Sequence, residues 1–501
     1  MKTKEKQQSH YNNGSNHHRH HRHHSDNRTL SMVGKILAVI ELAISAIFYG
    51  FLWNTGMVPG KYLIIVGIFL LLLFGICFGL EFTRKKSCLI IGIILSIGLS
   101  LMLGMGAYYV QQMDSAMKLV GGATYKTDNM VVIVKREDKA ETLLDAKEYT
   151  FGYQTSVDQK NTNLMVDKVK KNLGDNPKMK QYETTEELAK ALLDGQIDAA
   201  IYNEAFNAMI GDSVEDYESK IRILYQYGID TELEEEKDKA VNKPFNVYIS
   251  GIDVYGPITT NSRSDVNIIM TVNPETKQIL LSTTPRDYYV EIPGISGGQK
   301  DKLTHAGIYG VDKSMDTLEA LYDIEIDYYA RVNFSSLIKI IDVLGGVDVD
   351  SEYAFEAGGY SFKEGMNHLN GEKALAFSRE RYSFSAGDNQ RGRNQEAVIT
   401  AILKKAMSPA ILANANSLIA SVSDSLETNM TKDEMSELIR MQLDDGSAWN
   451  IVSVNAVGTG DSQACFSSGR QLLYVMQPNM VSVSEISTKM HQVMNGDTVL
   501  E

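Results

Sequence analysis

Three long apolar runs follow one another near the amino terminus, over residues 32–53, 62–82 and 88–110. Each is close to the ~20 residues that an α-helix needs to cross the hydrocarbon of a bilayer. A cleaved signal peptide is disfavoured because the first run is long, lacks a small-residue cleavage site and is followed by two more runs. The pattern predicts three transmembrane helices within residues 31–110.

Residues 1–30 show no apolar period. They hold the tract HHRHHRHH at positions 17–24, among Asn, Ser and Gly, and this composition is typical of disorder. A His tract can bind transition metals, but no second ligand cluster accompanies it. We therefore expect a disordered, His-rich tail.

Residues 111–229 alternate between strand-like and helix-like patterns. The strand-like segments are 130–135 and 198–203, and the helix-like segments are 164–173 and 186–193. This alternation predicts a small α/β accessory domain. Its order of motifs looks like one lobe of a solute-binding protein, and a spacer or interaction domain without a ligand explains it at least as well. The acidic stretch 230–243 has the composition of a solvated linker.

Residues 244–410 combine both periods in one domain. Strand patterns occupy 245–253, 266–272, 278–284 and 328–332, and helical patterns occupy 311–322, 334–344, 371–382 and 389–407. The segments around the NPETK turn predict a hairpin. Together these elements predict an α/β fold, an α-β-α sandwich with a mixed sheet. For residues 411–501 we expect a helical extension, with helices at 410–426 and 432–443.

Charge divides the chain. Residues 1–110 hold 11 Lys and Arg against 4 Asp and Glu, which leaves 38 against 59 for residues 111–501. The first part therefore carries +7 and the second −21, so the body lacks the cationic surface that nucleic-acid binding needs. Cys465 is the only cysteine of the body, which excludes a disulfide there.

Positive residues flank the apolar runs unevenly. Six Lys and Arg precede the first run and three lie at positions 84–86, whereas the loop between the first two runs carries only Lys61. Positive loops remain cytoplasmic. We expect a multi-pass protein of the cell membrane with a cytoplasmic amino terminus and residues 111–501 outside the cell.

Within the acidic body, arginines are grouped with carboxylates and polar residues. The groups contain Arg263 and Asp265; Arg286 and Asp287; Arg379 and Arg381; and Asp388, Arg391, Arg393 and Gln395. Arginine suits phosphate because its planar fork donates paired, charge-assisted hydrogen bonds. Any one pair fits a solvated helix face equally well, but four groups together favour an anion with more than one phosphoryl group.

Two aspartates accompany these arginines at strand ends. Asp253 ends one predicted strand and Asp265 begins the next, so the two carboxylates can approach each other. Mg²⁺ favours one or two carboxylates together with water and phosphate oxygens. The pair is a candidate metal site.

Several motifs of this domain look familiar as a set. They are FNVYISGIDVYG, SRSDVNIIMTVNPETKQILLSTTPRDYYV, QKDKLTHAGIYG, YYARVNF, IDVLGGVDVD, ALAFSRERYSF and GDNQRGRNQEAVITAIL. They resemble the catalytic domain of the LytR–CpsA–Psr family from about residue 245 to 407. The layout of three spans, an accessory domain and this domain is similar to family members that act in capsular polysaccharide synthesis in Gram-positive bacteria.

The resemblance implies a phosphotransferase that attaches a polyprenyl-pyrophosphate-linked glycopolymer, expected to be capsular, to peptidoglycan through a phosphodiester. It implies Mg²⁺, or Mn²⁺, at Asp253 and Asp265, and catalytic roles for Asp265, Asp388, Arg263 and Arg286. The implied pyrophosphate ligands are Arg263, Arg286, Lys302, Arg379, Arg381, Arg391 and Gln395. Asp265 or Asp388 is the candidate base, and the 318–344 region is a candidate for the polyprenyl groove.

Two other functions fit the same residues. Water in place of a sugar hydroxyl would give a polyprenyl pyrophosphate hydrolase, and the accessory domain with the spans would suit a sensor or regulator of capsule synthesis. Expected partners are the lipid-linked polymer, peptidoglycan, the membrane and proteins of capsule export or their kinase, but no nucleic acid.

Overall fold

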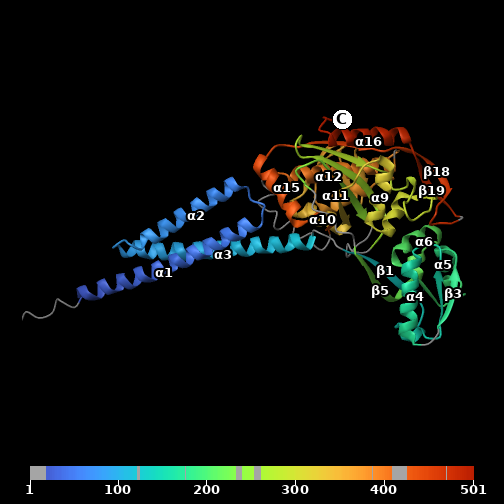
Figure 1. The fold of residues 1–501 in the computed structure, drawn as a ribbon, viewed down its shortest axis with the longest axis horizontal. Coiled ribbons are helices and arrows are strands. Elements are labelled where there is room, and N and C mark those ends of the chain that lie inside the picture. The colour runs from blue at the N-terminus through green and yellow to red at the C-terminus, as the bar shows by residue number, and fades with distance from the viewer. Residues whose placement is uncertain are drawn as a thin grey trace, which may run out of the picture. The chain divides into compact units, whose positions relative to one another are not determined.

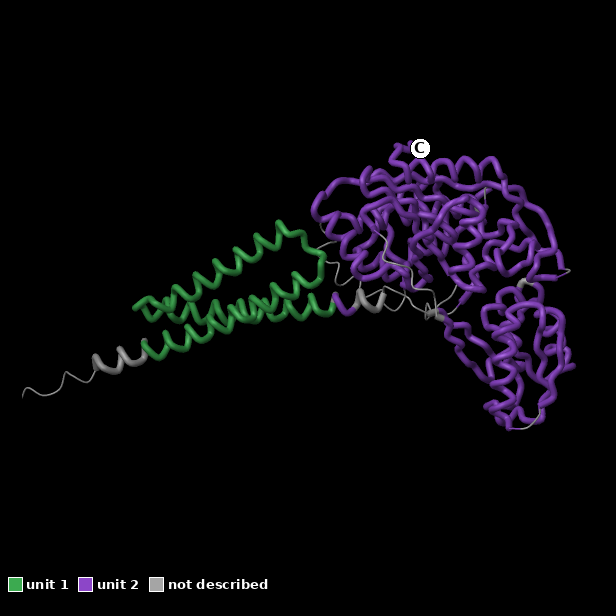
Figure 2. Tube along the Cα trace, in the orientation of Figure 1, with its two compact units in different colours: residues 1–112 green, residues 113–501 purple. Residues whose placement is uncertain are grey.

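The computed structural model describes residues 19–120, 125–174, 177–232, 240–252, 261–385, 387–408, 426–469 and 471–500. The chain divides into two compact units, Met1–Gln112 and Met113–Glu501 (Figure 2). The division falls where the predicted membrane segment ends.

Three long helices make up the first unit: α1 (Arg19–Asn54), α2 (Gly60–Leu80) and α3 (Lys86–Val120). Each contains a stretch long and apolar enough to cross a membrane, as predicted. Residues 1–18 lie outside the described residues. Helix α1 begins at Arg19, within the predicted tail, and the disorder expected for residues 1–30 stays a prediction.

The accessory domain contains a five-stranded sheet in the order β3-β2-β4-β1-β5 (Figure 1). Its strands are β1 (Tyr125–Lys135), β2 (Thr150–Gln154), β3 (Lys178–Tyr182), β4 (Ala199–Asn203) and β5 (Ile221–Glu232). Its helices are α4 (Gln159–Leu173), α5 (Thr185–Leu193), α6 (Asn207–Ser213) and α7 (Tyr217–Lys220), with 3₁₀ turns at Leu143–Ala146 and Glu204–Phe206. Strand β2 runs parallel to β3 and β4, whereas β1 is antiparallel to β4 and β5.

Helices cover both faces of this sheet because side chains of a strand alternate. Met130 and Val132 of β1 pack in one core with Met165 of α4. Val131 and Ile133 pack in a second core with residues of α5 and α6. The predicted α/β accessory domain is thus a three-layer sandwich.

The larger sheet has six strands in the order β16-β11-β6-β7-β8-β17. They are β6 (Phe245–Ile252), β7 (Ser264–Asn273), β8 (Gln278–Thr283), β11 (Tyr328–Asn333), β16 (Leu426–Thr428) and β17 (Asn450–Asn455). The sheet is mixed: β6, β7 and β8 form an antiparallel meander, whereas β11 and β17 run parallel to β6 and β8. The hairpin predicted around NPETK is confirmed.

Helices lie on both faces of the sheet (Figure 1). They are α8 (Leu303–Ala306), α9 (Val311–Tyr322), α10 (Phe334–Val343), α11 (Gly371–Arg379), α12 (Asp388–Ala406), α15 (Lys432–Asp445) and α16 (Met480–Met494), with a 3₁₀ turn at Gly307–Tyr309. Helices α9 and α16 share a core with Tyr248 and Leu280. Residues of α12 and α15 pack against the core of Val247 and Leu281 on the other face. The α-β-α sandwich is confirmed.

Short ribbons complete the domain. They pair β9 (Tyr289–Glu291) with β10 (Lys300–Lys302), β12 (Val347–Ser351) with β15 (Gly365–Leu369), β13 (Phe355–Ala357) with β14 (Tyr360–Phe362), and β18 (Gly458–Ala464) with β19 (Leu472–Pro478). The expectation of a purely helical extension after residue 411 is therefore wrong, although the predicted helix at 432–443 is present as α15, which begins with a Thr431–Glu434 capping box. The alternating NIVSVN segment is a strand because the exposed edge of β8 offers it backbone partners. Helix 410–426 falls almost wholly outside the described residues.

The accessory domain and the larger domain of the second unit also share contacts. Ile308, only 1% exposed, packs in the same core as Phe206. Lys126 pairs with Asp312 at 3.0 Å. The two domains are therefore joined by side-chain contacts as well as by the stretch 230–243, of which residues 233–239 are not described.

Candidate active site

A cavity of about 690 Å³ opens between the larger sheet and helices α10, α11 and α12. Its polar lining comprises Arg263, Asp265, Arg286, Asn333, Ser378, Arg379, Arg381, Tyr382, Arg391 and Gln395. Its apolar lining includes Val247, Ile249, Met270, Ala330, Val332, Phe334, Leu337, Ile340, Val398, Ile399, Ile402 and Leu403. Five guanidinium groups face a single described carboxylate, so the lining is strongly cationic within an acidic body.

The strand register separates a polar end from an apolar end. Gly251 lies opposite Val266, next to Asp265, whereas Val247 lies opposite Met270. Helix α12 repeats this order, because Arg391 precedes Leu403 by twelve residues, or ~18 Å at 1.5 Å per residue. The cavity is an amphiphilic groove, cationic at one end and hydrocarbon-like at the other.

Asp265 reaches the polar end through a β-bulge. Ile252 pairs with Ser264 and Gly251 pairs with Val266, so Asp265 is the extra residue of β7. A bulge bends the strand and redirects a side chain. Glycine is required at position 251 because a Cβ there would lie 2.6 Å from Val266 Cγ2.

The arginines keep Asp265 ionised. Its Oδ1 lies 2.9 Å from Arg286 Nη1 and accepts a hydrogen bond of 3.3 Å from Thr304. Burial by itself would raise the pKa of Asp265, but Arg286, Arg263 and Arg391 outweigh it and hold that pKa below its ordinary value. A carboxylate held in this way is suited to cation binding or orientation and is a weak proton acceptor.

The remaining arginines come from helix ends. Arg391 and Gln395 lie four residues apart on α12 and therefore face the same side. Arg379 is the last residue of α11, and its guanidinium lies 4.1 Å from the centre of the Phe334 ring. The guanidinium of Arg381 lies 4.6 Å from the centre of the Tyr382 ring. Stacking orients these forks while leaving their edges able to donate hydrogen bonds.

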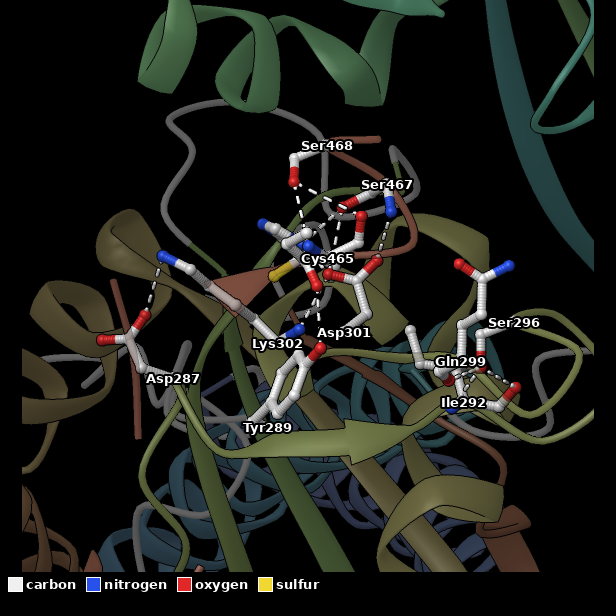
Figure 3. Close-up of polar contacts among 12 residues, drawn as sticks. Asp287, Tyr289, Ile292, Ser296, Gln299, Asp301, Lys302, Cys465, Ser467 and Ser468 are labelled. Atoms are coloured by element: carbon white, nitrogen blue, oxygen red, sulfur yellow. Dashed lines mark hydrogen bonds and ion pairs between the residues drawn. The ribbon is translucent and has the colours of Figure 1, made fainter. Parts of the chain in front are cut away.

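Lys302 is not among the lining residues. Its Nζ lies 3.1 Å from Asp287 (Figure 3). The other oxygen of Asp287 is 3.8 Å from Arg286 Nε, so Lys302 reaches the arginine cluster only indirectly. Arg393 contacts Glu352 at 3.2 Å instead of the cavity. Asp253 lies outside the described residues. Asp388 begins α12, but its side chain is not described.

A Ser–His–Asp group lies beside Lys302 but is not arranged for nucleophilic catalysis. His305 Nδ1 lies 2.6 Å from Asp301 and 3.0 Å from Ser467 Oγ, and Figure 3 shows Asp301 and Ser467 facing each other. In a catalytic triad the serine and the carboxylate contact different ring nitrogens. The group instead joins β10 and α8 to the segment after β18.

The predicted 318–344 region contributes only its second half to the groove. Phe334, Leu337 and Ile340 line the cavity, whereas Leu318 is fully buried in the core on the other face of the sheet. Residues 398–403 of α12 were missed as groove residues because apolar positions of a helix look alike whether they meet a core or a cavity.

Glu396 was also missed. It is 2% exposed, and its carboxyl oxygens accept hydrogen bonds from Thr283 at 2.7 Å and Asn455 at 2.8 Å. Burial raises its pKa to about 8. Glu396 fixes α12 to strands β8 and β17, and thereby positions its neighbours Gln395 and Arg391.

The side chains described at the groove provide only part of a divalent-cation site. Asp265 offers an ionised carboxylate at the groove, and the Asp253 carboxylate needed beside it is not described. No cluster of three or more His, Cys, Asp or Glu side chains suited to a metal occurs in the described ranges. Any cation held here would therefore use few protein ligands and leave positions to phosphate oxygens.

Comparison with known proteins gives this site a context. The LytR_cpsA_psr family model matches residues 214–489. The polyisoprenyl-teichoic acid–peptidoglycan teichoic acid transferase TagU of Enterococcus faecalis is 36% identical over 238 residues, 46% of this chain and 77% of that protein. TagU of Bacillus subtilis is 36% identical over 210 residues, 41% of this chain and 67% of its own length. The crystal structure of B. subtilis TagV aligns with a TM-score of 0.44 and 28% identity, covering 52% of this chain and 99% of that one. The family match covers more than half of the sequence, and the chain belongs to the LytR–CpsA–Psr family.

Proposed function

We propose that this protein transfers a glycopolymer from a polyprenyl pyrophosphate carrier to peptidoglycan, with formation of a phosphodiester. The observation that carries the proposal is the amphiphilic groove, whose arginine end opens into an apolar channel. A pyrophosphate joined to a hydrocarbon chain has the same polarity. A soluble phosphate ester would leave the apolar half without a ligand.

The two halves of the groove have separate roles in binding. The polyprenyl chain packs between β6 and α12, where burial of apolar surface stabilises it by roughly 25 cal/mol per Å². The guanidinium forks of Arg263, Arg286 and Arg391 bind the pyrophosphate oxygens. Binding energy from the chain then fixes the phosphorus relative to the arginines, which phosphoryl transfer needs more than covalent help from the protein.

The reaction is a substitution at the phosphorus next to the polymer. An acceptor hydroxyl of peptidoglycan forms the new oxygen–phosphorus bond, the bond to the bridging oxygen breaks, and polyprenyl phosphate leaves. Arginine side chains stabilise the charge that develops on the non-bridging and leaving oxygens. The hydroxyl proton passes to a carboxylate, and Asp388 is the stronger candidate because the arginines favour the ionised form of Asp265.

We further propose a Mg²⁺ or Mn²⁺ ion held by Asp265 together with Asp253. Such an ion would offset phosphate charge and assist the leaving group. Lys302 acts at a distance by pairing with Asp287, which weakens the competition of that carboxylate with the ligand for Arg286.

The location follows from the charge pattern. A cytoplasmic amino terminus and an odd number of spans place residues 113–501 outside the cell, where peptidoglycan and the lipid-linked polymer meet. We propose capsular polysaccharide as the polymer from the layout of the chain, and the names of the TagU relatives make teichoic acid the rival substrate.

The test uses the full chain in detergent micelles with peptidoglycan and either lipid-linked capsular polysaccharide or lipid-linked teichoic acid. The expected product is a covalent conjugate that survives hot detergent and is released by phosphodiester cleavage. Release of free polymer at the same rate without peptidoglycan would instead identify a hydrolase.

A further inference from the structure

A second cavity, of about 310 Å³, lies apart from the arginine groove within the second unit. The accessory domain contributes Lys126, Asp128, Ser156, Val157, Asp158, Lys160, Asn161, Asn203 and Thr231 to its lining. The catalytic domain contributes Gly294, Ile295, Ile308, Tyr309, Lys313 and Phe466. None of these residues lines the groove described above.

The topology of the accessory sheet makes this position a natural ligand site. Strands β2 and β4 are parallel neighbours, and the chain leaves them toward opposite faces, to α4 after β2 and to α6 after β4. In open α/β sheets, ligands bind beyond the carboxyl ends of the strands at such a switch point. Asp158 follows β2 and Asn203 ends β4, so the cavity lies at this place.

Asp158 is held in an uncommon conformation beside the cavity. Its φ of 46° is left-handed, and its side chain makes no capping bond to α4. The carboxylate instead accepts a hydrogen bond of 2.9 Å from Asn203. Burial, with the nearby charge of Asp128, raises the pKa of Asp158 to about 6. A strained backbone at a buried carboxylate, whose ionisation is unfavourable, occurs more often at functional sites than at structural ones.

Donors, acceptors and aromatic surface are mixed in the lining. Asp128 accepts from three amides: Asn161 at 3.0 Å, Asn203 at 3.3 Å and Asn261 at 2.8 Å. The Tyr309 hydroxyl is buried and finds no partner among the described residues. Phe466 adds an apolar ring.

This mixture selects one ligand class. Lys160 opposes a bound cation, as do Lys126 and Lys313 to a lesser degree because they pair with Asp312 and Asp316. Asp128 and Asp158 oppose a phosphate or other anion. A sugar ring carries hydroxyls that both donate to carboxylates and accept from amides or ammonium groups, and its C–H face packs on an aromatic side chain. A neutral polyhydroxylated ring can therefore hydrogen-bond to both the acidic and the basic groups of the lining.

We propose that this cavity is a saccharide-binding site between the accessory and catalytic domains. This assignment rests on the proposed transferase function only for the source of the sugar. That source is either the glycan strand of peptidoglycan or the transferred polymer. The accessory domain thereby selects or orients one sugar substrate while the arginine groove binds the lipid.

Calorimetric titration of the full chain in detergent micelles tests this assignment. One arm uses muramidase-solubilised glycan fragments of peptidoglycan, a second uses polymer released from its lipid, and a third uses inorganic phosphate. We expect one of the two saccharide arms to bind and phosphate not to compete. Failure of both saccharide arms, or competition by phosphate, would overturn the site.

Variants locate the binding. Asp158→Gly keeps the left-handed conformation without strain and Lys160→Ala removes an exposed lining ammonium, so each should weaken binding about tenfold or more. The matched controls are Lys171→Ala, at an exposed position of α4 outside the cavity, and Arg391→Ala, which should impair lipid binding alone. Unchanged sugar affinity in the folded Lys160→Ala and Asp158→Gly proteins would refute the proposal. Sugar affinity and lipid affinity are measured separately in each variant. Loss of sugar affinity with intact lipid affinity would therefore locate the effect in the saccharide cavity and not in the lipid site of the proposed transferase.

Discussion

Replacement of Arg391 by alanine gives the sharpest test of the arginine groove, because α12 provides its own control. Arg391 lines the cavity, whereas Arg393, two residues later, contacts Glu352 away from it. Both changes remove one positive charge and one long side chain from the same helix. Any difference between the two variants therefore reports the direction in which the side chain points.

The expected magnitude follows from the contacts that a guanidinium makes with phosphate. A hydrogen bond to a charged group contributes about 1.5–3 kcal/mol, which corresponds to a roughly 10- to 150-fold weaker affinity. Arg391→Ala should also raise the pKa of Asp265, because Arg391 is one of the groups that lower it. Arg393→Ala should change lipid affinity by less than about twofold, as expected for loss of an exposed ion pair.

The assay measures binding of a fluorescent polyprenyl pyrophosphate to the full chain in detergent micelles at two salt concentrations. Thermal unfolding of each variant confirms that the fold is intact. Arg391→Lys should recover only part of the affinity, since lysine keeps the charge but loses the fork. Equal affinities for the Arg391→Ala and Arg393→Ala proteins would refute the placement of pyrophosphate at this end of the groove.

Three further changes test other parts of the structure. Glu396 has a folded-state pKa of about 8 against 4.5 when unfolded, so its contribution to stability is complete below pH 4.5 and is lost as pH rises through 8. Relative to Glu396→Gln, wild type should lose about 3.5 kcal/mol of unfolding free energy between pH 5 and 8, and parallel stability curves would contradict the burial argument. Asp265→Asn should abolish transfer while the protein remains folded, and excess chelator should do the same to wild type until Mg²⁺ is restored; full transfer in chelator would exclude the metal. Protease added to cells stripped of their wall should digest residues 113–501 and spare the amino-terminal tail, and a protected body would reverse the proposed orientation.

Local patterns in the sequence determined the elements of this protein. Runs of about 20 apolar residues can be stable only across a bilayer or in a core, so the three long helices follow from composition. Alternation in FNVYISGI and the NPETK turn predicted the hairpin and strand positions. The grouped arginines predicted an anion site, because so many cations in an acidic domain need a common partner.

Tertiary structure alone decided how those residues divide between core, groove and surface. Arg391 and Arg393 look equivalent in sequence, yet the helical turn directs one into the cavity and the other toward Glu352. Leu318 and Leu337 are both apolar helix positions, but opposite faces of one sheet make the first core and the second groove. The saccharide cavity assembles side chains from positions 126 to 466. Its composition depends on strand order and domain contacts, which act over distances that no local pattern records.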